Sequence, residues 1–312
     1  PIELSIIAHN KNRYQGTIYV VADQPYVIYQ EHTIVDAAGN GNGLADYNEC
    51  FSLDMSFNNV GNQPAVDVTA VLSTDDEYVE ITVDSADLGD FPAETVLNFS
   101  NVFNLQTTNF VPDQHRVLLD LELTGDGEDS WTSHFFITLQ APILSVGNMY
   151  IDDSEGDGDS FLDPGETALV SIPVFNQGHA LSPQAVATLT CSNGLISIQP
   201  VIDQITGLEP DDDFSLFFLI TVDSETLVGT PVILDFSLNC TGYESYNVNE
   251  SFIQTIGLIL DSFETGNFSS FNWQSGGDAV WTVVDNQAYD GIYSARSGNI
   301  GSWESSYLSL EL

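Results

Sequence analysis

Apolar residues alternate with polar ones along much of the chain, in short runs separated by Gly, Asn, Asp and Ser. Two runs show an apolar residue at every second position: Phe51, Leu53, Met55 and Phe57, and Ala168, Val170, Ile172 and Val174. A period of two residues is typical of a strand with one buried face. No convincing stripe with the helical period appears. The pattern therefore predicts an all-β fold.

The strand pattern also repeats. Residues 64–72 correspond to 183–191, and residues 117–123 correspond to 232–238, at offsets of 119 and 115 residues. Each unit then holds roughly seven short strands in about 115 residues, the size and rhythm of an immunoglobulin-like sandwich. We expect one sandwich over residues 25–141 and a second over 142–256. Their short junction, near residues 140–143, suggests that the two pack in a fixed row.

Two acidic loops, loop one (residues 36–49) and loop two (residues 153–166), superpose without a gap at an offset of 117 residues. Four matched positions carry side-chain oxygens with the spacing of template positions 3, 5, 9 and 12 of an EF-hand calcium loop. These residues are Asn40, Asn42, Asp46 and Glu49 in loop one, and Asp157, Asp159, Asp163 and Glu166 in loop two. A polar hairpin turn is the simpler alternative.

The first template position departs from the EF-hand pattern, because it holds Ala38 in loop one and Glu155 in loop two. Asp36 and Asp153, two residues upstream, are expected to supply the missing carboxylate. We therefore predict about two Ca²⁺ ions, one in each loop. Since a strand pattern rather than a helix follows each loop, these ions would be structural clamps and not part of a helix-opening sensor.

Charge narrows the possible partners. The chain has 46 acidic residues and only four Lys and Arg residues, which gives a formal net charge of −42. Binding to nucleic acid or to an anionic membrane needs a basic face, and these residues cannot build one. The longest apolar run, near residues 216–222, is too short to cross a bilayer. Self-repulsion makes bound cations stabilising, although a halophilic origin would also explain an acidic surface.

The three cysteines differ in their expected orientation. The alternation places Cys191 and Cys240 on inward-facing positions of the second sandwich. A disulfide between them is the preferred interpretation, and two buried free thiols are the alternative. Cys50 has the opposite parity to Phe51, so it is expected to face outward without a partner.

Beyond residue 256 the rhythm changes to aromatic residues and Gly/Ser turns, in segments 261–273, 276–281 and 291–298. This stretch resembles the beginning of the cleaved-adhesin, MAM-like jelly-roll domains of surface proteins in Bacteroidetes-type bacteria. The resemblance implies that residues 257–312 form the first part of a jelly-roll sandwich.

Residues 4–20 predict two strands joined by an Asn-rich turn at Asn10 and Lys11, followed by Tyr14 and a strand through Ile18 and Val20. They resemble the closing hairpin of the Ig-like domain that follows the catalytic domain in gingipain-type cysteine peptidases, so residues 1–24 are expected to close a preceding domain. Loops such as loop two are also frequent downstream of such peptidases and in other type IX-secreted proteins. The resemblances imply a secreted, cell-surface location.

Catalytic groupings are missing from the sequence. The five histidines lie in separate contexts, and no Ser-His-Asp, Cys-His or clustered zinc motif is apparent. We therefore expect a non-catalytic, calcium-stabilised stalk or adhesin-like region, from a gingipain-like peptidase precursor. One alternative is a carbohydrate- or protein-binding module that uses Trp273, Trp281 and Trp303. Another is a subunit of an extracellular filament or surface layer, formed by self-association.

These hypotheses imply different partners. An adhesin would contact a host or matrix protein or a glycan, and a stalk would contact the flanking domains of a longer precursor.

Overall fold

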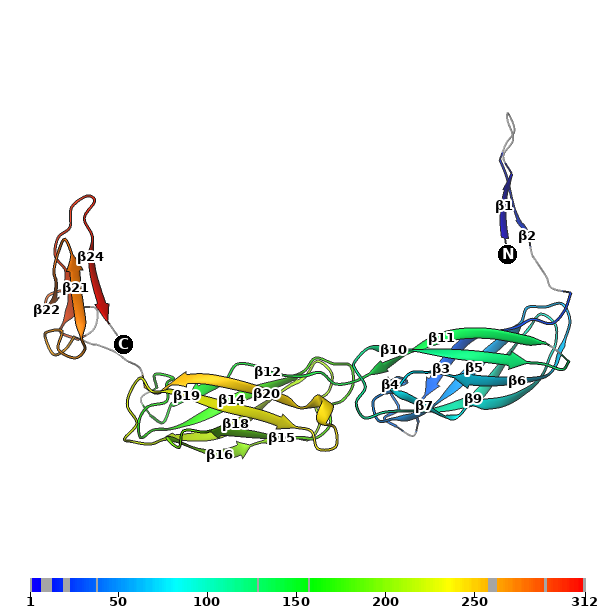
Figure 1. Cartoon of the computed structure of the whole chain (residues 1–312), viewed down its shortest axis with the longest axis horizontal. Coiled ribbons are helices and arrows are strands. Elements are labelled where there is room, and N and C mark those ends of the chain that lie inside the picture. Colours follow the sequence, from blue (N-terminus) through cyan, green and yellow to red (C-terminus); the bar gives the residue numbers. More distant parts are fainter. Residues whose placement is uncertain are drawn as a thin grey trace.

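The computed structural model describes residues 2–6, 13–18, 23–37, 39–127, 129–156, 158–257, 263–288 and 291–310. The regular elements of these ranges are strands, apart from the short 3₁₀ turn η1 (Glu244–Tyr246). The all-β prediction is therefore confirmed. We name the unit built from β3 to β11 sandwich one and the unit built from β12 to β20 sandwich two; the two lie end to end (Figure 1).

Sandwich one consists of two sheets that face each other. The first sheet has the order β3 (Val27–Val35), β5 (Cys50–Asn59), β9 (Thr95–Thr107) and β7 (Val79–Val83). The second has the order β4 (Ala45–Asp46), β11 (Ser130–Gln140), β10 (His115–Thr124), β6 (Ala65–Ser73) and β8 (Ser85–Phe91). All pairings are antiparallel except the short one between β4 and β11.

Sandwich two repeats this topology. In its first sheet, β12 (Leu144–Val146) and β13 (Tyr150–Asp152) both pair with β14 (Thr167–Asn176), which is followed by β18 (Asp213–Val222) and β16 (Ile196–Ile202). Its second sheet has the order β17 (Gln204–Ile205), β15 (Ala185–Cys191), β19 (Pro231–Asn239) and β20 (Val248–Thr255). A parallel bridge between Leu162 and Ile256 stands where β4 pairs with β11. The two units thus share one strand order, while their predicted boundaries stay predictions.

The terminal segments form smaller sheets. β1 (Ile2–Ile6) pairs antiparallel with β2 (Tyr14–Ile18), as expected for the hairpin, whose turn at Asn10 and Lys11 lies outside the described residues. Near the other end, β21 (Trp273–Gly277) pairs with β24 (Ser306–Leu310), and β22 (Trp281–Val284) pairs with β23 (Ser294–Ser297).

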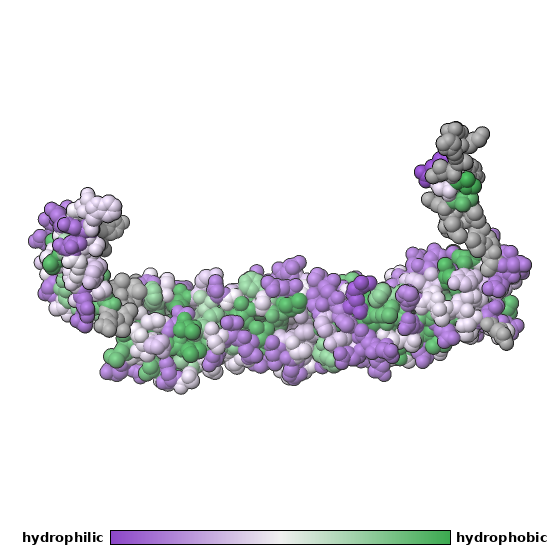
Figure 2. All heavy atoms as spheres, turned by 45° about the horizontal axis from the view of Figure 1, so that its top comes forward, coloured by the Kyte–Doolittle hydropathy of each residue, from purple (hydrophilic) through white to green (hydrophobic). Residues whose placement is uncertain are grey.

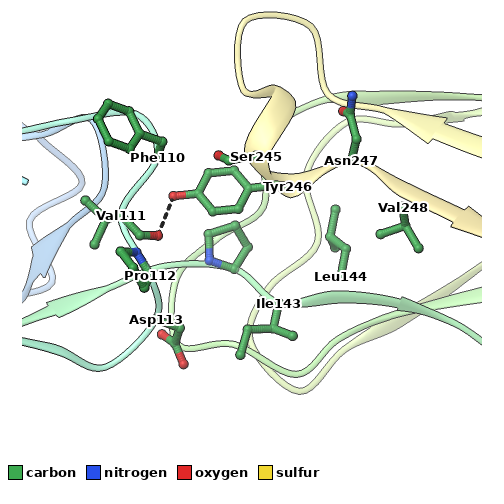
Figure 3. Close-up of a pocket in the computed structure, with 11 residues that line it drawn as sticks. Phe110, Val111, Pro112, Asp113, Ile143, Leu144, Ser245, Tyr246, Asn247 and Val248 are labelled. Carbon is green, nitrogen blue, oxygen red and sulfur yellow. Dashed lines mark hydrogen bonds between the residues drawn. The ribbon is translucent and has the colours of Figure 1, made fainter.

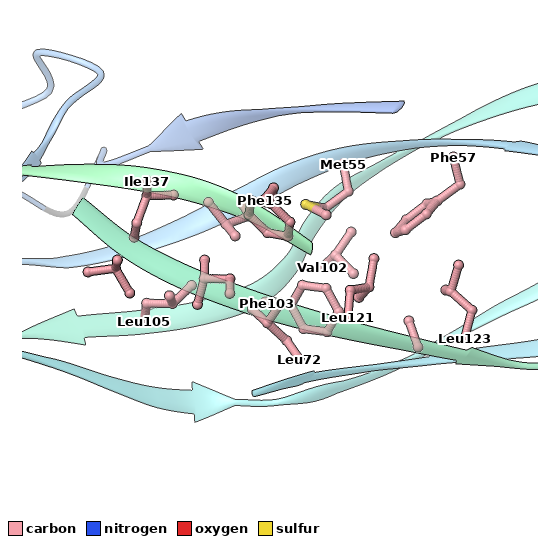
Figure 4. Packing of buried hydrophobic residues seen from close by; sticks show 14 of the residues in the cluster. Met55, Phe57, Leu72, Val102, Phe103, Leu105, Leu121, Leu123, Phe135 and Ile137 are labelled. Atoms are coloured by element: carbon pink, nitrogen blue, oxygen red, sulfur yellow. The ribbon is translucent and has the colours of Figure 1, made fainter. Parts of the chain in front are cut away.

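Each sandwich has its own core. The alternating residues of β5 and β14 named above are all at most 4% exposed. In sandwich one, Phe103 of β9, Leu121 of β10 and Phe135 of β11 belong to one buried cluster between the two sheets (Figure 4). Because successive side chains of a strand point to opposite faces, the period-two pattern was enough to identify the inward positions of β5 and β14.

A buried asparagine bonds the entrance of each sandwich, the segment through which the chain enters it, and the sequence pattern did not predict this residue. Asn176 is 1% exposed; its Oδ1 accepts from the amides of Ile143 and Gly178 at 3.2 and 3.1 Å. Its Nδ2 donates to the carbonyls of Ala180 and Leu208 at 2.8 and 2.9 Å. Asn59, 117 residues earlier, bonds the entrance of sandwich one in the same way. Each asparagine therefore ties the incoming chain to its sandwich.

The structure corrects the expected disulfide. Cys191, Cys240 and Cys50 are all free thiols, with Cys240 buried and Cys50 exposed. β15 and β19 are neighbours, but their register pairs Cys191 with Leu234, six residues before Cys240. At about 3.3 Å per residue this separates the two thiols by roughly 20 Å along the sheet, far beyond the reach of a disulfide. Both cysteines lie on the inward parity, as expected, and each lies at or directly after the C-terminal end of its strand; because the two strands are antiparallel, these are opposite ends of the sheet.

The surface of both sandwiches mixes hydrophilic side chains with small apolar groups, without one continuous apolar band on the face in view (Figure 2). Among the described residues, no helix has the length and apolar character needed to span a membrane.

Candidate metal sites and the junction between the sandwiches

The two acidic loops share one hydrogen-bonded geometry. The amide of Gly39 donates to the carbonyl of Asp36 at 2.7 Å, and the amide of Gly156 to that of Asp153 at 2.6 Å. The Asp36 and Asp153 carboxylates then turn into their loops, where they accept from the amides of Gly43 and Ser160, respectively, at 3.1 and 3.0 Å. Both aspartates are 4% exposed. Their position inside the loop is the one that the metal prediction requires.

The last acid of each loop folds back over a glycine. Glu49 Oε2 accepts from the amide of Asp46 at 3.0 Å, and Glu166 Oε2 accepts from that of Asp163 at 3.1 Å. A Cβ on Gly39 would lie 1.8 Å from Glu49 Oε1, and one on Gly156 would lie 1.6 Å from Glu166 Oε1. Glycine at these positions therefore makes room for the carboxylate.

Asp46 is the centre of loop one. Its Oδ2 accepts from the side-chain amides of Asn40 and Asn42, whereas its buried Oδ1 has no hydrogen-bond partner. Burial raises the pKa of the Asp46 carboxyl, the two amide bonds lower it, and the negative charge of Asp36 raises it further. Burial also raises the pKa of Glu49, with Asp46 and Asp36 adding repulsion. Loop one thus contains three buried acids, Asp36, Asp46 and Glu49.

The predicted ligands of loop two differ in their solvent exposure. In loop two, Glu155 is exposed, Asp159 and Asp163 are half-buried, and Asp157 lies outside the described residues. Asp159 Oδ1 accepts from the amide of Phe161 at 2.9 Å, as Asn42 Oδ1 does from that of Leu44 at 2.7 Å. Across the described ranges, no three His, Cys, Asp or Glu side chains converge as a ready-made metal centre. The metal prediction therefore stays a prediction.

The donor set of loop one nevertheless suits a hard cation. Buried carboxylates need a compensating positive charge or a proton, and the sequence places no Lys or Arg between Arg13 and Arg116. In the part of the chain that the structure describes, the two close contacts between a histidine and an aspartate lie elsewhere: they join His115 to Asp76 and His179 to Asp113. The unpartnered Asp46 Oδ1 and the carboxylate and amide oxygens around it are the ligand types that Ca²⁺ prefers.

Loop one also makes the contact between the two sandwiches, which the sequence did not reveal. The hydroxyl of Tyr47 donates to the carbonyl of Leu181 at 2.9 Å. Its ring packs edge-on against Tyr243 and Tyr246, with centroids 5.6 and 5.1 Å away. Asn48 Nδ2 donates to the Tyr243 hydroxyl at 2.9 Å. Burial raises the pKa of Tyr47 and of Tyr246, so both phenols stay neutral donors.

Further bonds complete this junction. The Tyr246 hydroxyl donates to the carbonyl of Val111 at 2.9 Å across the junction (Figure 3). Asp113 accepts from the amide of Ala141 at 3.0 Å and lies 2.7 Å from His179 Nδ1. Beside them is an open cavity of about 340 Å³, lined by residues of both sandwiches. The junction therefore consists of directional bonds and aromatic contacts rather than a bare linker.

The remaining candidate residues do not form a catalytic group in the ranges described. His32 contacts Tyr29, and His115 and His179 contact separate aspartates; His9 lies outside those ranges. Of the three C-terminal tryptophans, Trp303 is fully exposed. Trp273 packs against Phe263 and Phe268, and Trp281 is half-buried.

Comparison with known proteins gives no family. No family model matches the chain, and no curated protein matches it. Solved structures with some likeness include a FixG-related protein from Vibrio parahaemolyticus, 14% identical over 37% of this chain and 97% of that one, with a TM-score of 0.28. A protein of unknown function from Porphyromonas gingivalis W83 is 14% identical over 68% and 94%, with a TM-score of 0.22.

The C-terminal domain of the AgI/II polypeptide BspA from Streptococcus agalactiae is 9% identical over 72% of this chain and 99% of that one, with a TM-score of 0.34. At such scores these likenesses carry no inference about function.

Proposed function

We propose that this chain is a non-catalytic, calcium-stabilised spacer of a secreted surface protein, in which tandem sandwiches hold flanking domains apart. The observation that carries the proposal is the position of loop one: its buried acids Asp46 and Glu49 flank Tyr47 and Asn48, which bond sandwich one to sandwich two. A spacer needs resistance to bending at its junctions, and directional bonds on several sides of a short linker supply it.

The proposed role of Ca²⁺ follows from the chemistry of the loops. In loop one, Asp36, Asp46 and Glu49 would provide carboxylates, and Asn40 and Asn42 would provide amide oxygens after a half-turn of each amide, which exchanges its oxygen and nitrogen. The equivalent oxygens of loop two would come from Asp153, Asp157, Asp159, Asp163 and Glu166. A bound ion would neutralise buried negative charges that otherwise repel.

The proposed origin of the chain, in a peptidase precursor, rests on sequence resemblances. The resemblances of residues 4–20 and 257–312 support an origin in the region downstream of a gingipain-like peptidase, at the surface of a bacterium. The flanking domains of such a precursor would be the partners of the spacer, and a host or matrix protein or a glycan would be the target of an adhesin-like segment.

Thermal unfolding with and without EDTA, combined with calcium calorimetry, tests the central proposal. We expect two bound ions and a clear fall in melting temperature on chelation, because a ligand at 100 times its Kd stabilises the native state by about 2.7 kcal/mol per site. Mg²⁺ at the same concentration is the control for unspecific charge screening. An unchanged melting temperature in EDTA would remove calcium from the proposal.

One observation favours a second candidate, glycan or protein binding by the C-terminal segment. The indole of Trp303 is fully exposed, and an exposed aromatic face suits stacking against a sugar. Glycan-array binding by the whole chain that is lost in Trp303→Ala would support it.

A further inference from the structure

Loop one and loop two have the same arrangement of acids, but the residues at two matched positions, one in the loop and one in the strand beside it, are different. Tyr47 of loop one is matched by Pro164 of loop two. Thr107 at the end of β9 is matched by Val222 at the end of β18, because each donates its amide to the carbonyl of the last loop acid at 2.9 Å. The two loops therefore share their acids but can form different bonds to the rest of the protein.

The first difference concerns the linker and the neighbouring sandwich. The amide of Tyr47 donates to the carbonyl of Gln140, at the start of the linker, at 2.9 Å, and its hydroxyl reaches Leu181 in sandwich two. Pro164 has neither an amide hydrogen nor a phenol, so it can make neither bond. Only loop one can thus hold both the linker and the next sandwich through this position.

The second difference concerns how firmly the loop is attached to its own sandwich. Thr107 Oγ1 accepts from the amide of Glu49 at 2.9 Å and donates to the carbonyl of Asp46 at 2.5 Å. Val222 has no hydroxyl with which to do this. The segment from Asp46 to Glu49 is therefore fixed at both ends, and it contains Tyr47 and Asn48, the two residues of loop one that bond sandwich two.

This arrangement links cation binding in loop one to the docking of sandwich two. Without a cation, the buried carboxylates of Asp36, Asp46 and Glu49 repel one another. A backbone shift at Asp46 or Glu49 that relieves the repulsion displaces Tyr47 and Asn48, which lie between them. By linkage, a contact that stabilises the closed loop must also tighten cation binding, and the reverse holds to the same extent.

We infer that cation binding in loop one is coupled to docking of sandwich two, whereas cation binding in loop two leaves this junction unchanged. The inference rests on the proposed calcium-stabilised spacer and names its regulation: the stiffness of one particular junction follows the calcium concentration. The second site would stabilise only the fold of its own sandwich.

Matched substitutions in the full chain test the coupling. Glu49→Gln and Glu166→Gln each remove the last carboxylate of one loop. Residues 240–247 of sandwich two contact loop one through Tyr243 and Tyr246. In saturating calcium, their hydrogen exchange should become at least about tenfold faster in Glu49→Gln, since sub-global opening sets exchange rates. In Glu166→Gln the same segment should exchange as in the wild type.

A second pair tests the reverse direction. Tyr47→Ala should weaken calcium binding at one site by about fivefold or more, at the lower end of typical coupling factors. Pro164→Ala, at the matched position of loop two, should leave both affinities unchanged. Should Glu49→Gln fail to fold, Tyr47→Ala, which removes the ring that packs against Tyr243 and Tyr246, still has to accelerate exchange of residues 240–247.

The outcomes separate the two proposals. Loss of one calcium ion in Glu49→Gln without faster exchange of residues 240–247 would overturn the coupling and leave the calcium-stabilised spacer standing. Equal acceleration in Glu49→Gln and Glu166→Gln would overturn the difference between the loops. Absence of calcium binding by the wild-type chain would instead overturn the proposed function.

Discussion

Replacing Asn176 by alanine removes four hydrogen bonds at once from the entrance of sandwich two. The side chain is 1% exposed, and its bonds of 2.8 to 3.2 Å hold two amides and two carbonyls that lie around it. A buried hydrogen bond contributes about 1 kcal/mol net, and more when its partner stays unsatisfied. We therefore expect Asn176→Ala to cost roughly 4 kcal/mol.

For a unit of this size, that loss lowers the melting temperature by about 15–20 °C. Differential scanning calorimetry in saturating calcium measures it. Asn59→Ala should lower the transition of sandwich one by a similar amount, so the two variants together assign the transitions. Asn249→Ala, at an exposed position of β20, is the control and should change the melting temperature little.

Asn176→Asp tests the two accepted bonds separately from the two donated bonds. The aspartate keeps an acceptor for Ile143 and Gly178 but loses both donated bonds and buries a charge, so it should be at least as destabilising as alanine at neutral pH. A fall of less than about 3 °C in Asn176→Ala would refute the reasoning, because it would mean that water or a shifted backbone replaces the four bonds at little cost.

The other predictions concern charge and thiols. Because the pKa values of Asp46 and Glu49 are raised in the folded chain, the native state binds more protons than the unfolded state above pH of about 4, so in EDTA the stability of sandwich one should rise as the pH is lowered from 7 toward about 5. Asp46→Asn should therefore raise its melting temperature in EDTA at pH 7 but lower it in calcium; melting curves with the same sign in both buffers would contradict the metal assignment. In a thiol titration without reductant, exposed Cys50 should react in the native chain, whereas Cys240, whose pKa burial raises to about 11, should react only after unfolding. Fewer than three titratable thiols in denaturant would instead indicate a disulfide.

The inward faces of the strands could be read from the sequence because they depend on local geometry. Phe51 and Val170 are buried while the residues on either side of them are half-buried or exposed, because the pleat turns every second side chain to the core. The acid spacing of the loops is also local, since all its members lie within 14 residues. Asp36 and Asp153 could thus be assigned to the candidate site from the sequence.

Contacts between residues far apart in the sequence could not be predicted from this local pattern. Cys191 and Cys240 share an inward parity, but only the register of β15 against β19 decides that they lie at opposite ends of one sheet. Parity is a property of one strand, whereas register depends on the turns and the core that bring two strands together. The same reason explains why Asn59 and Asn176 were missed: their partners are backbone groups up to 33 residues away.

The sequence by itself determined that this protein is made of strands, that it repeats, and that each repeat carries an acidic loop, because alternation and spacing act over a few residues. Only the tertiary structure decided what loop one does. Tyr47 meets Leu181, Tyr243 and Tyr246 because folding brings together segments more than 130 residues apart, and no pattern in one segment encodes the surface of another. The matched Pro164 gained significance only when that contact was known.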